Sequence, residues 1–465
     1  MTSKAMTVGE LRASGYQSRT VRQELRSNLV AKIASGEDLF PGIKGFDNTV
    51  IPALENAILA GQDIIFLGER GQAKSRIIRS LVELLDEEIP VLDGPELPED
   101  PYEPISHAGR ALIADKGDDA PVRWMPRADR YGEKLATPDI TIADLIGEVD
   151  PIKVAEGRYL SDEMTIHYGL VPRTNRGIFC INELPDLAER IQVGLLNIME
   201  ERDVQIRGFR VRLPLDVFVV ASANPEDYTN RGRIITPLKD RYGSQIRTHY
   251  PTEIETEIAI MQQEATLIDL EDIRVTIPDY MEEIIAEITR LARRSPDVSQ
   301  RSGVSVRTSI ATYETLAANA VRRSIRLGEN HAVPRVTDLP HLVPAIQGKL
   351  ELETVDEDSD SQVIEKLISG AEAAVFNRRF NIVDLEELVE QFKAGISVEI
   401  GEDMPSNSYA KLLNQVEGLR EAIQPFDVGE DNALIAGAIE FLLEGLHLNK
   451  RLNKDNVGGH IQYRG

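Results

Sequence analysis

The chain has 465 residues, of which 42% are hydrophobic and 28% charged, a composition typical of a soluble protein with more than one folded unit. Its formal net charge of −25 opposes binding to the phosphates of DNA or RNA, so nucleic acid is not an expected partner. No stretch approaches the roughly 18 apolar residues of a membrane span, and no secretion signal is visible. We therefore expect a cytoplasmic protein without a membrane span.

The N-terminal 39 residues are expected to form a helical arm. Val21, Leu25, Leu29 and Ile33 recur at four-residue spacing, which places them on one face of a helix that ends near Gly36. The arm leads into residues 40–62, which read as a loop and an amphipathic helix.

Short, continuous apolar runs follow at residues 63–67, 177–181 and 217–221, with helical stretches between them. Such runs are typical of buried strands in a parallel sheet. The alternation predicts a three-layer α/β domain over residues 40–250. Cys180, the single cysteine, lies within the second run, so a buried structural thiol is expected and an internal disulfide is excluded.

The C-terminal half is predicted to be helical. Thr252 to Glu255 has the pattern of a capping box, and an apolar face continues from Val306 to Gly328, which would end its helix. Residues 251–350 are therefore a predicted helical domain. Residues 351–465 are predicted to be an acidic linker that starts at Glu351, a helical extension and a Gly-rich tail.

The strongest chemical signal directly follows the first predicted strand. It is a P-loop pattern whose backbone N–H groups would wrap the β-phosphate of a nucleotide, with Lys74 on the β- and γ-phosphates and the Ser75 hydroxyl on Mg²⁺. Ala73 replaces the glycine that usually precedes the lysine, which is harmless at negative φ and narrows the cradle at positive φ. A plain Gly-rich turn is the alternative. The nucleotide-binding residues predicted here are Gly68, Glu69, Arg70, Gly71, Gln72, Ala73, Lys74 and Ser75.

Two more predicted strands end in polar residues. Asn182 and Glu183 stand where a P-loop enzyme carries its Walker B acids, so Glu183 is the candidate general base. Asn182 stands where an aspartate usually binds the water shell of Mg²⁺, and its neutral amide predicts weaker metal binding. Asn224 would position the attacking water, although Asn-Pro is also a common turn.

The three elements occur in the order of a known family. Residues 40–54 (FPGIKGFDNTVIPAL), 169–184 (GLVPRTNRGIFCINEL) and 222–228 (SANPEDY) carry the similarity, and residues 40–350 resemble the AAA+ ATPases of the magnesium-chelatase small-subunit and MoxR group. The resemblance implies a three-layer AAA+ P-loop NTPase domain with a parallel sheet, an α-helical lid domain and a helical C-terminal extension. It also implies that Arg241 is an arginine finger and that Arg307, at the start of a lid helix, is sensor 2.

By the same resemblance, residues 204–213 form a hairpin and residues 157–168 form an insert, and both face the axis of a ring. Arg207, Arg210 and Arg212 of the hairpin are candidates for gripping an acidic partner, with a plain solvated hairpin as the alternative.

The function implied by the resemblance is a motor that binds and hydrolyses ATP with Mg²⁺. An arginine finger that acts on the nucleotide of a neighbouring subunit implies a homo-oligomeric ring. A hexamer is the expected size. Relatives work with a partner that carries a von Willebrand factor A domain, so remodelling of such a partner is expected. The alternative is a nucleotide-gated scaffold with little hydrolysis, because Ala73 and Asn182 depart from the pattern. Two further functions are weaker alternatives, because the sequence lacks their motifs: a transcription activator that acts on an RNA-polymerase sigma factor, and a hydrolase with a serine or cysteine nucleophile.

Overall fold

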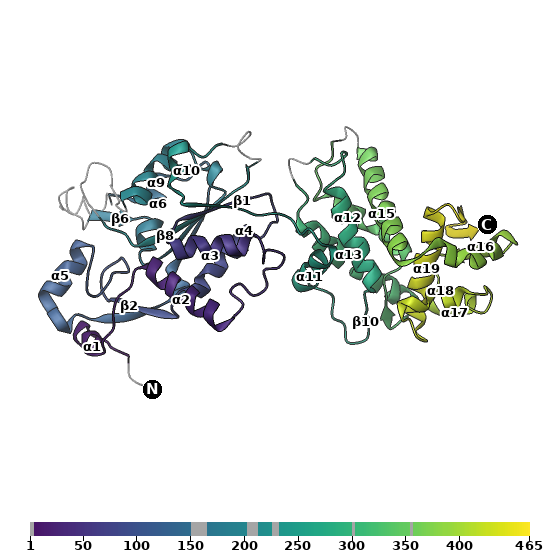
Figure 1. Cartoon of the computed structure of the whole chain (residues 1–465), viewed down its shortest axis with the longest axis horizontal. Helices are drawn as coiled ribbons and strands as arrows, with labels where there is room; N and C mark the ends of the chain where they lie inside the picture. The colour runs from purple at the N-terminus through teal and green to yellow at the C-terminus, as the bar shows by residue number, and fades with distance from the viewer. Residues whose placement is uncertain (1–3, 150–164, 202–212, 226–231, 300–302, 354–356) are drawn as a thin grey trace. The chain divides into compact units, whose positions relative to one another are not determined.

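The computed structural model describes residues 4–149, 165–201, 213–225, 232–299, 303–353 and 357–465 (Figure 1). The chain divides into two compact units, Met1–His249 and Tyr250–Gly465. Each unit has its own hydrophobic core.

The first unit is built on a five-stranded parallel sheet. The predicted buried strands at residues 63–67, 177–181 and 217–221 are confirmed, and every residue of these three observed strands is buried. Two strands at the sheet edges were not predicted from the sequence. In spatial order the strands are β4 (Tyr131–Leu135), β7 (Gly177–Asn182), β8 (Val217–Ala223), β1 (Ile64–Leu67) and β9 (Ser244–Arg247).

Helices cover both faces of this sheet, which makes the three predicted layers (Figure 1). Alternate strand residues point to opposite faces, as Ile64 and Phe66 pack with one set of helices while Ile65 and Leu67 pack with the other. The helices α2 (Val21–Ser35), α3 (Val50–Ala60) and α4 (Lys74–Ser80) cover one face; α6 (Ile142–Leu145), α8 (Leu170–Arg173), α9 (Glu189–Glu201) and α10 (Thr236–Arg241) lie on the other.

The predicted N-terminal helix is present as α2, which ends at Gly36 in the left-handed conformation. Val21, Leu25 and Leu29 are buried in the same core as α3, whereas Ile33 is 45% exposed. The N-terminal segment is thus part of the core of the first unit. The remaining elements of this unit are α1 (Val8–Ala13), η1 (Leu81–Leu84), β2 (Glu88–Leu92), α5 (His107–Lys116), η2 (Gly117–Asp119), β3 (Val122–Pro126), η3 (Arg127–Arg130), β5 (Gly147–Val149), β6 (Ile166–Tyr168) and η5 (Leu184–Asp186).

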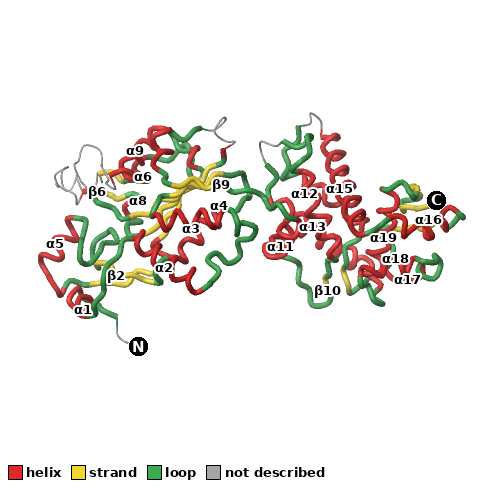
Figure 2. The backbone as a smooth tube through the Cα atoms, in the orientation of Figure 1, coloured by secondary structure: helices red, strands yellow, loops and turns green. Residues whose placement is uncertain are grey.

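The second unit is largely helical (Figure 2). Its central helix is buried along almost its whole length and contacts helices from both sides of residue 350, so the predicted lid and C-terminal extension share one core. Its helices are α11 (Ile254–Glu264), α12 (Asp279–Ala292), α13 (Val306–Leu327), η7 (Val336–Leu342), α14 (Val343–Gln347), α15 (Glu357–Arg379), η8 (Ile382–Leu385), α16 (Glu386–Lys393), α17 (Ser406–Leu412), α18 (Leu419–Ile423), η9 (Gln424–Phe426) and the central α19 (Asn432–Leu448).

Three local predictions for this unit were wrong. The helix α11 begins after Glu253 without a side-chain cap, so Thr252 forms no capping box. The acidic stretch predicted as a linker enters α15 at Glu357, because this helix buries an apolar face in the core. The predicted tail is a β-hairpin whose Tyr463 is fully buried.

The strands of the second unit are β10 (Arg274–Val275), β11 (His331–Ala332), β12 (Ser397–Ile400), β13 (Asn453–Val457) and β14 (His460–Arg464).

Gly328 ends α13 with a φ of 68°, as predicted. Among the described residues, no helix combines the length and apolar character that crossing a membrane requires.

Candidate nucleotide-binding site

The predicted chemical residues of the first unit meet at one edge of its sheet. Leu67 at the end of β1 pairs with Ala223 of β8, and Ile181 of β7 pairs with Ala221. The pairing continues beyond β1, since the backbone N–H of Gly68 donates to Ala223 O at 3.1 Å. The next residues of all three strands therefore leave the sheet at its carboxyl edge, where open parallel sheets bind ligands.

The segment Gly68–Ser75, called the P-loop from here on, connects β1 to α4. The ammonium group of Lys74 lies inside this loop. It donates to the carbonyl oxygens of Gly68 at 2.6 Å and Glu69 at 2.7 Å. Lys74 is only 6% exposed. Gly71 has a φ of 74°, a value that suits glycine. Ser75 is in the first turn of α4 and half-buried, whereas the Arg70 side chain is exposed.

Ala73 has a φ of 55° and lies in the left-handed region. This is the positive-φ case, for which the sequence predicts a narrower phosphate cradle. A residue with a Cβ is strained in this region by roughly 1–2 kcal/mol. Replacement of the usual glycine therefore stores strain directly before Lys74.

Thr248 supports the P-loop from the neighbouring strand and was missed from the sequence. Its backbone N–H donates to Leu67 O at 2.9 Å, and its hydroxyl donates to Gln72 Oε1 at 2.7 Å. The Gln72 oxygen also accepts from the backbone N–H of Glu69 at 3.1 Å. A Cβ on Gly68 would lie 1.9 Å from Thr248 Oγ1, so only glycine fits. Strand β9 is too short and too polar to be recognised from the sequence. Thr248, which follows this strand, was therefore not predicted as a site residue.

Asn182 is buried and held from two sides. Its Nδ2 donates to the carboxylate of Glu133 on β4, and its Oδ1 accepts from Ser222 Oγ on β8 at 3.1 Å. These bonds fix the orientation of the amide. Asn182 is therefore a link between three strands of the sheet.

Glu133 places a carboxylate beside the neutral Asn182. Arg79 of α4 donates to its two oxygens at 2.9 and 2.8 Å, and the Tyr131 hydroxyl donates at 3.0 Å. The hydrogen bond from Arg79 holds the pKa of Glu133 below its usual value, so this group stays ionised. No motif marks Glu133; only the parallel pairing of β4 with β7 brings it to Asn182.

Glu183 and Asn224 leave the two adjacent strands at the same edge. Glu183 has a φ of 54°, and its backbone N–H donates to Ser222 Oγ at 3.1 Å. Asn224 directly follows β8 and is 2% exposed. Ser222 thus connects the backbone of Glu183 to the side chain of Asn182.

The two predicted arginines are not among the residues brought together here. Arg241 ends α10, and its guanidinium pairs with Glu200 of α9 at 2.7 Å and with Asp240 at 3.3 Å. Arg307 is an exposed residue in the first turn of α13 and belongs to the second unit.

The predicted hairpin, including Arg207, Arg210 and Arg212, lies outside the described residues except for Leu213. The predicted insert at residues 157–168 is described only from Thr165 onward, where β6 pairs with β5.

The polar groups of the P-loop and of Asn182 are of the kinds that bind a nucleoside triphosphate with Mg²⁺. Because Gly68 has no side chain, Thr248 and Gln72 pack directly against the start of the loop, and Lys74 supplies a positive charge for a phosphate. For the metal, the Ser75 hydroxyl and the Asn182 amide offer oxygen donors of the kind Mg²⁺ accepts. The Cys180 thiol is fully buried, and burial raises its pKa to about 12, so it is not a nucleophile.

No family model matches the chain. Curated proteins similar to it include the magnesium-chelatase 38 kDa subunit of Rhodobacter capsulatus, 26% identical over 240 residues, which are 49% of this chain and 60% of that protein. The magnesium-chelatase subunit ChlI of Nostoc is 24% identical over 267 residues, or 55% of this chain and 64% of that protein. The chain thus spans less than two thirds of the length of either relative.

Solved structures give weaker similarities. A complex of subunits BchI and BchD of magnesium chelatase matches with a TM-score of 0.36 and 20% identity, over 69% of this chain and 98% of that chain. NtrX from Brucella abortus in complex with ATP matches with a TM-score of 0.41 and 14% identity, over 76% of this chain and 66% of that chain.

Proposed function

Since the chain is a distant homologue of the magnesium-chelatase ChlI subunits, we propose that it is an AAA+ ATPase that binds and hydrolyses ATP at the P-loop. One observation carries the proposal. The P-loop, Asn182, Glu183 and Asn224 stand at the ends of three adjacent parallel strands, on one edge of the sheet.

Binding replaces the internal contacts of Lys74. Its ammonium leaves the carbonyls of Gly68 and Glu69 and pairs with the β- and γ-phosphates, which offer a stronger, charge-assisted hydrogen bond. The backbone N–H groups of the P-loop contact the β-phosphate. The hydrogen bond from Thr248 to Gln72 holds the P-loop in position while this exchange occurs.

Hydrolysis needs a water molecule in line with the γ-phosphate and a group that accepts its proton. Glu183 acts as the general base, and its left-handed backbone, held by Ser222, aims the side chain from the end of β7. The Asn224 amide orients the water. Ser75 and Asn182 would hold Mg²⁺, which when bound would supply positive charge that offsets the charge of the phosphates.

The site is proposed to be completed in a ring. Arg241 leaves Glu200 and reaches the γ-phosphate on a neighbouring subunit, while Arg307 of the lid senses the bound nucleotide on its own subunit. A closed ring, with a hexamer as the preferred size, then gives each subunit a neighbour. The cycle would remodel a partner protein, for which a von Willebrand factor A domain is the expected class.

A nucleotide-gated scaffold with little hydrolysis is the second candidate. It is favoured by the strained Ala73 and by Asn182, whose amide brings no negative charge to the metal and is already engaged by Glu133 and Ser222. In this case the bound nucleotide changes the conformation of the chain without being consumed rapidly.

The deciding experiment measures ATP binding and phosphate release by the purified chain with Mg²⁺. Lys74→Ala should lose binding, and Glu183→Gln should bind ATP without turnover. Glu37→Gln, which removes an exposed carboxylate after α2, is the control and should match the wild type. Tight binding by Lys74→Ala would contradict the placement of the site. Binding without turnover by the wild type, alone and with a partner, would favour the scaffold.

A further inference from the structure

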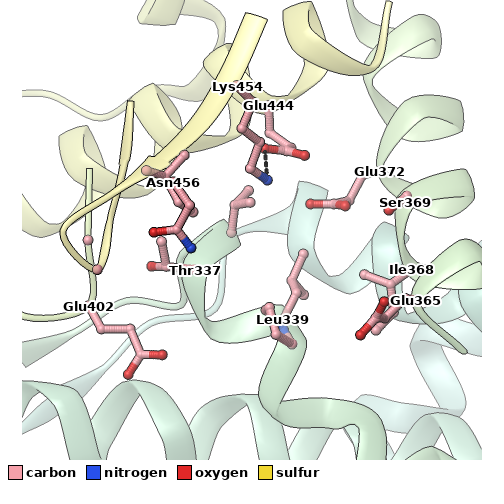
Figure 3. Close-up of a pocket in the computed structure, with 15 residues that line it drawn as sticks. Thr337, Leu339, Glu365, Ile368, Ser369, Glu372, Glu402, Glu444, Lys454 and Asn456 are labelled. Carbon is pink, nitrogen blue, oxygen red and sulfur yellow. Dashed lines mark hydrogen bonds and ion pairs between the residues drawn. The ribbon is translucent and has the colours of Figure 1, made fainter. Parts of the chain in front are cut away.

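The second unit contains a cavity of about 360 Å³ that is separate from the P-loop (Figure 3). It is lined by residues of η7, α15, α19, β13 and β14 and by the two residues that follow β12. Four carboxylates line it, with a single lysine as the charged group of opposite sign: Glu365, Glu372, Glu402, Glu444 and Lys454. The volume is in the range of pockets that take small organic molecules.

Glu444 already has two partners, both on the same carboxylate oxygen. Its Oε2 accepts from Lys454 Nζ at 2.7 Å and from the hydroxyl of Tyr463. Glu444 is 4% exposed, whereas the side chain of its partner Lys454 is 30% exposed. The lysine of the cavity is therefore committed to this carboxylate.

Glu372 differs from Glu444 because its buried Oε1 has no hydrogen-bond partner among the described residues. The residue is 5% exposed, and Figure 3 shows its carboxylate directed into the cavity. Burying a carboxylate without a partner is costly, so the group either binds a proton or awaits a cation. Burial raises its pKa well above the usual value, with Glu444 adding to the shift and Lys454 opposing it.

The other walls indicate the kind of cation. Leu339, Ile368 and Ile461 line the same cavity and offer apolar contact. Within the described part of the chain, no group of three histidine, cysteine or acidic side chains is arranged to hold a metal ion. A ligand that combines one ammonium group with an aliphatic body matches both the unpaired carboxylate and the apolar walls.

We propose that this cavity binds a small aliphatic amine whose ammonium group pairs with Glu372. The proposal does not rest on the proposed ATPase activity, because the lining residues all belong to the second unit and the P-loop belongs to the first.

The test titrates the full-length chain with cadaverine and with spermidine in a calorimeter. Glu372→Gln should weaken binding by at least about tenfold, because it removes a charged hydrogen-bond acceptor. Ser369→Leu keeps every carboxylate but fills the cavity from α15, and it should also abolish binding. Glu430→Gln removes an exposed carboxylate elsewhere in the unit and should bind like the wild type.

Three controls separate the chemistry of the ligand. Uncharged 1,5-pentanediol should not bind, and binding equal to that of cadaverine would overturn the role of the ammonium. Mg²⁺ alone should not compete; displacement of cadaverine by Mg²⁺ would overturn the assignment to an amine. Tighter binding of a lysine blocked at both backbone ends would assign the site to a side chain of another protein. Equal affinity of the wild type and Glu372→Gln, or no binding of any amine, would overturn the proposal.

Proton exchange gives a second readout. Glu365, Glu402, Glu444 and Lys454 face the cavity together with Glu372, and the empty site favours the protonated form of Glu372. An ammonium ligand needs the ionised form, so binding should release a proton and tighten as the pH rises toward the raised pKa of Glu372. This dependence should disappear in Glu372→Gln, and its persistence there would contradict the assignment to this carboxylate.

Discussion

Ala73 combines a strained backbone with a position next to the phosphate-binding lysine. Its φ of 55° costs an alanine more than a glycine, so Ala73→Gly should raise the free energy of unfolding of the first unit by about 1 kcal/mol. The same change relaxes the loop, so it should also tighten ATP binding. Urea denaturation and a fluorescent-nucleotide titration measure the two effects.

Ala111→Gly is the matched control for this prediction. Ala111 is exposed within the helix α5, where glycine is unfavourable by about 1 kcal/mol, so the sign of the stability change should be opposite. A loss of stability in both variants would show that Ala73 is not strained in solution.

Asn182 is held by a carboxylate, and this determines how the site responds to restoring the usual aspartate. Asn182→Asp removes the donor to Glu133 and places two carboxylates side by side, so it should destabilise the fold by about 2 kcal/mol. Adding Glu133→Gln exchanges the roles of the two side chains and should recover most of the loss. Chemical denaturation of the two single variants and the double variant measures the coupling.

Metal-dependent ATP affinity provides a functional readout of the same pair. The double variant should gain more affinity on addition of Mg²⁺ than the wild type, because residue 182 is then a carboxylate. Strictly additive stability changes would mean that Glu133 and Asn182 do not interact in solution.

At the scale of elements, the C-terminal hairpin is a structural part of the second unit. Tyr463 on β14 is fully buried, and its hydroxyl donates to Glu444. Tyr463→Ala should therefore destabilise this unit by about 3–5 kcal/mol, the range found for large aromatic residues in cores. Tyr463→Phe keeps the packing and should cost much less. Thermal unfolding measured by circular dichroism distinguishes them.

Val457→Ala tests the same hairpin at an exposed position. Val457 is 52% exposed on β13, so this change should leave the melting temperature nearly unchanged. Equal melting temperatures for Tyr463→Ala and Val457→Ala would indicate that the hairpin is detached from the core in solution.

The three central strands and the helices α2 and α13 could be predicted because their apolar patterns are local. Strand β7, for example, is a continuous apolar run, and Gly328 marks the end of α13. The C-terminal hairpin could not be predicted, because its strands are largely polar and Tyr463 is its single fully buried residue. The linker prediction failed because charge density alone hides the apolar residues that follow in α15.

The candidate site shows the same division. Lys74, Ser75, Glu183 and Asn224 follow recognisable strand ends, so local patterns identify them. Pairing between strands determines the neighbours Thr248, Ser222 and Glu133, which are far apart in the sequence. Such contacts follow from the order of strands in the sheet, which no short motif contains.

At the scale of the whole molecule, the chain divides into two units, and the P-loop lies in the first of them. ATP should therefore protect the first unit from hydrogen exchange directly, since a ligand stabilises the state it binds.

A mixing experiment tests whether catalysis crosses between subunits. Arg241→Ala should bind ATP yet lose about a thousandfold in turnover, and Lys74→Ala should not bind at all. Mixed in equal amounts, the two inactive variants should recover about a quarter of the wild-type rate, since one interface in four then pairs an intact P-loop with an intact arginine.

Recovery should fail when Lys74→Ala is replaced by the variant that carries both changes, because no intact arginine is then present. Differently tagged subunits that purify together prove that mixing occurred. If mixed rings form without recovered activity, Arg241 does not act on a neighbouring site, and its ion pair with Glu200 is then its main role. If activity returns, the isolated chain holds only part of its own active site. The insertion of Arg241 into the nucleotide site of a neighbouring subunit is then the event that controls hydrolysis.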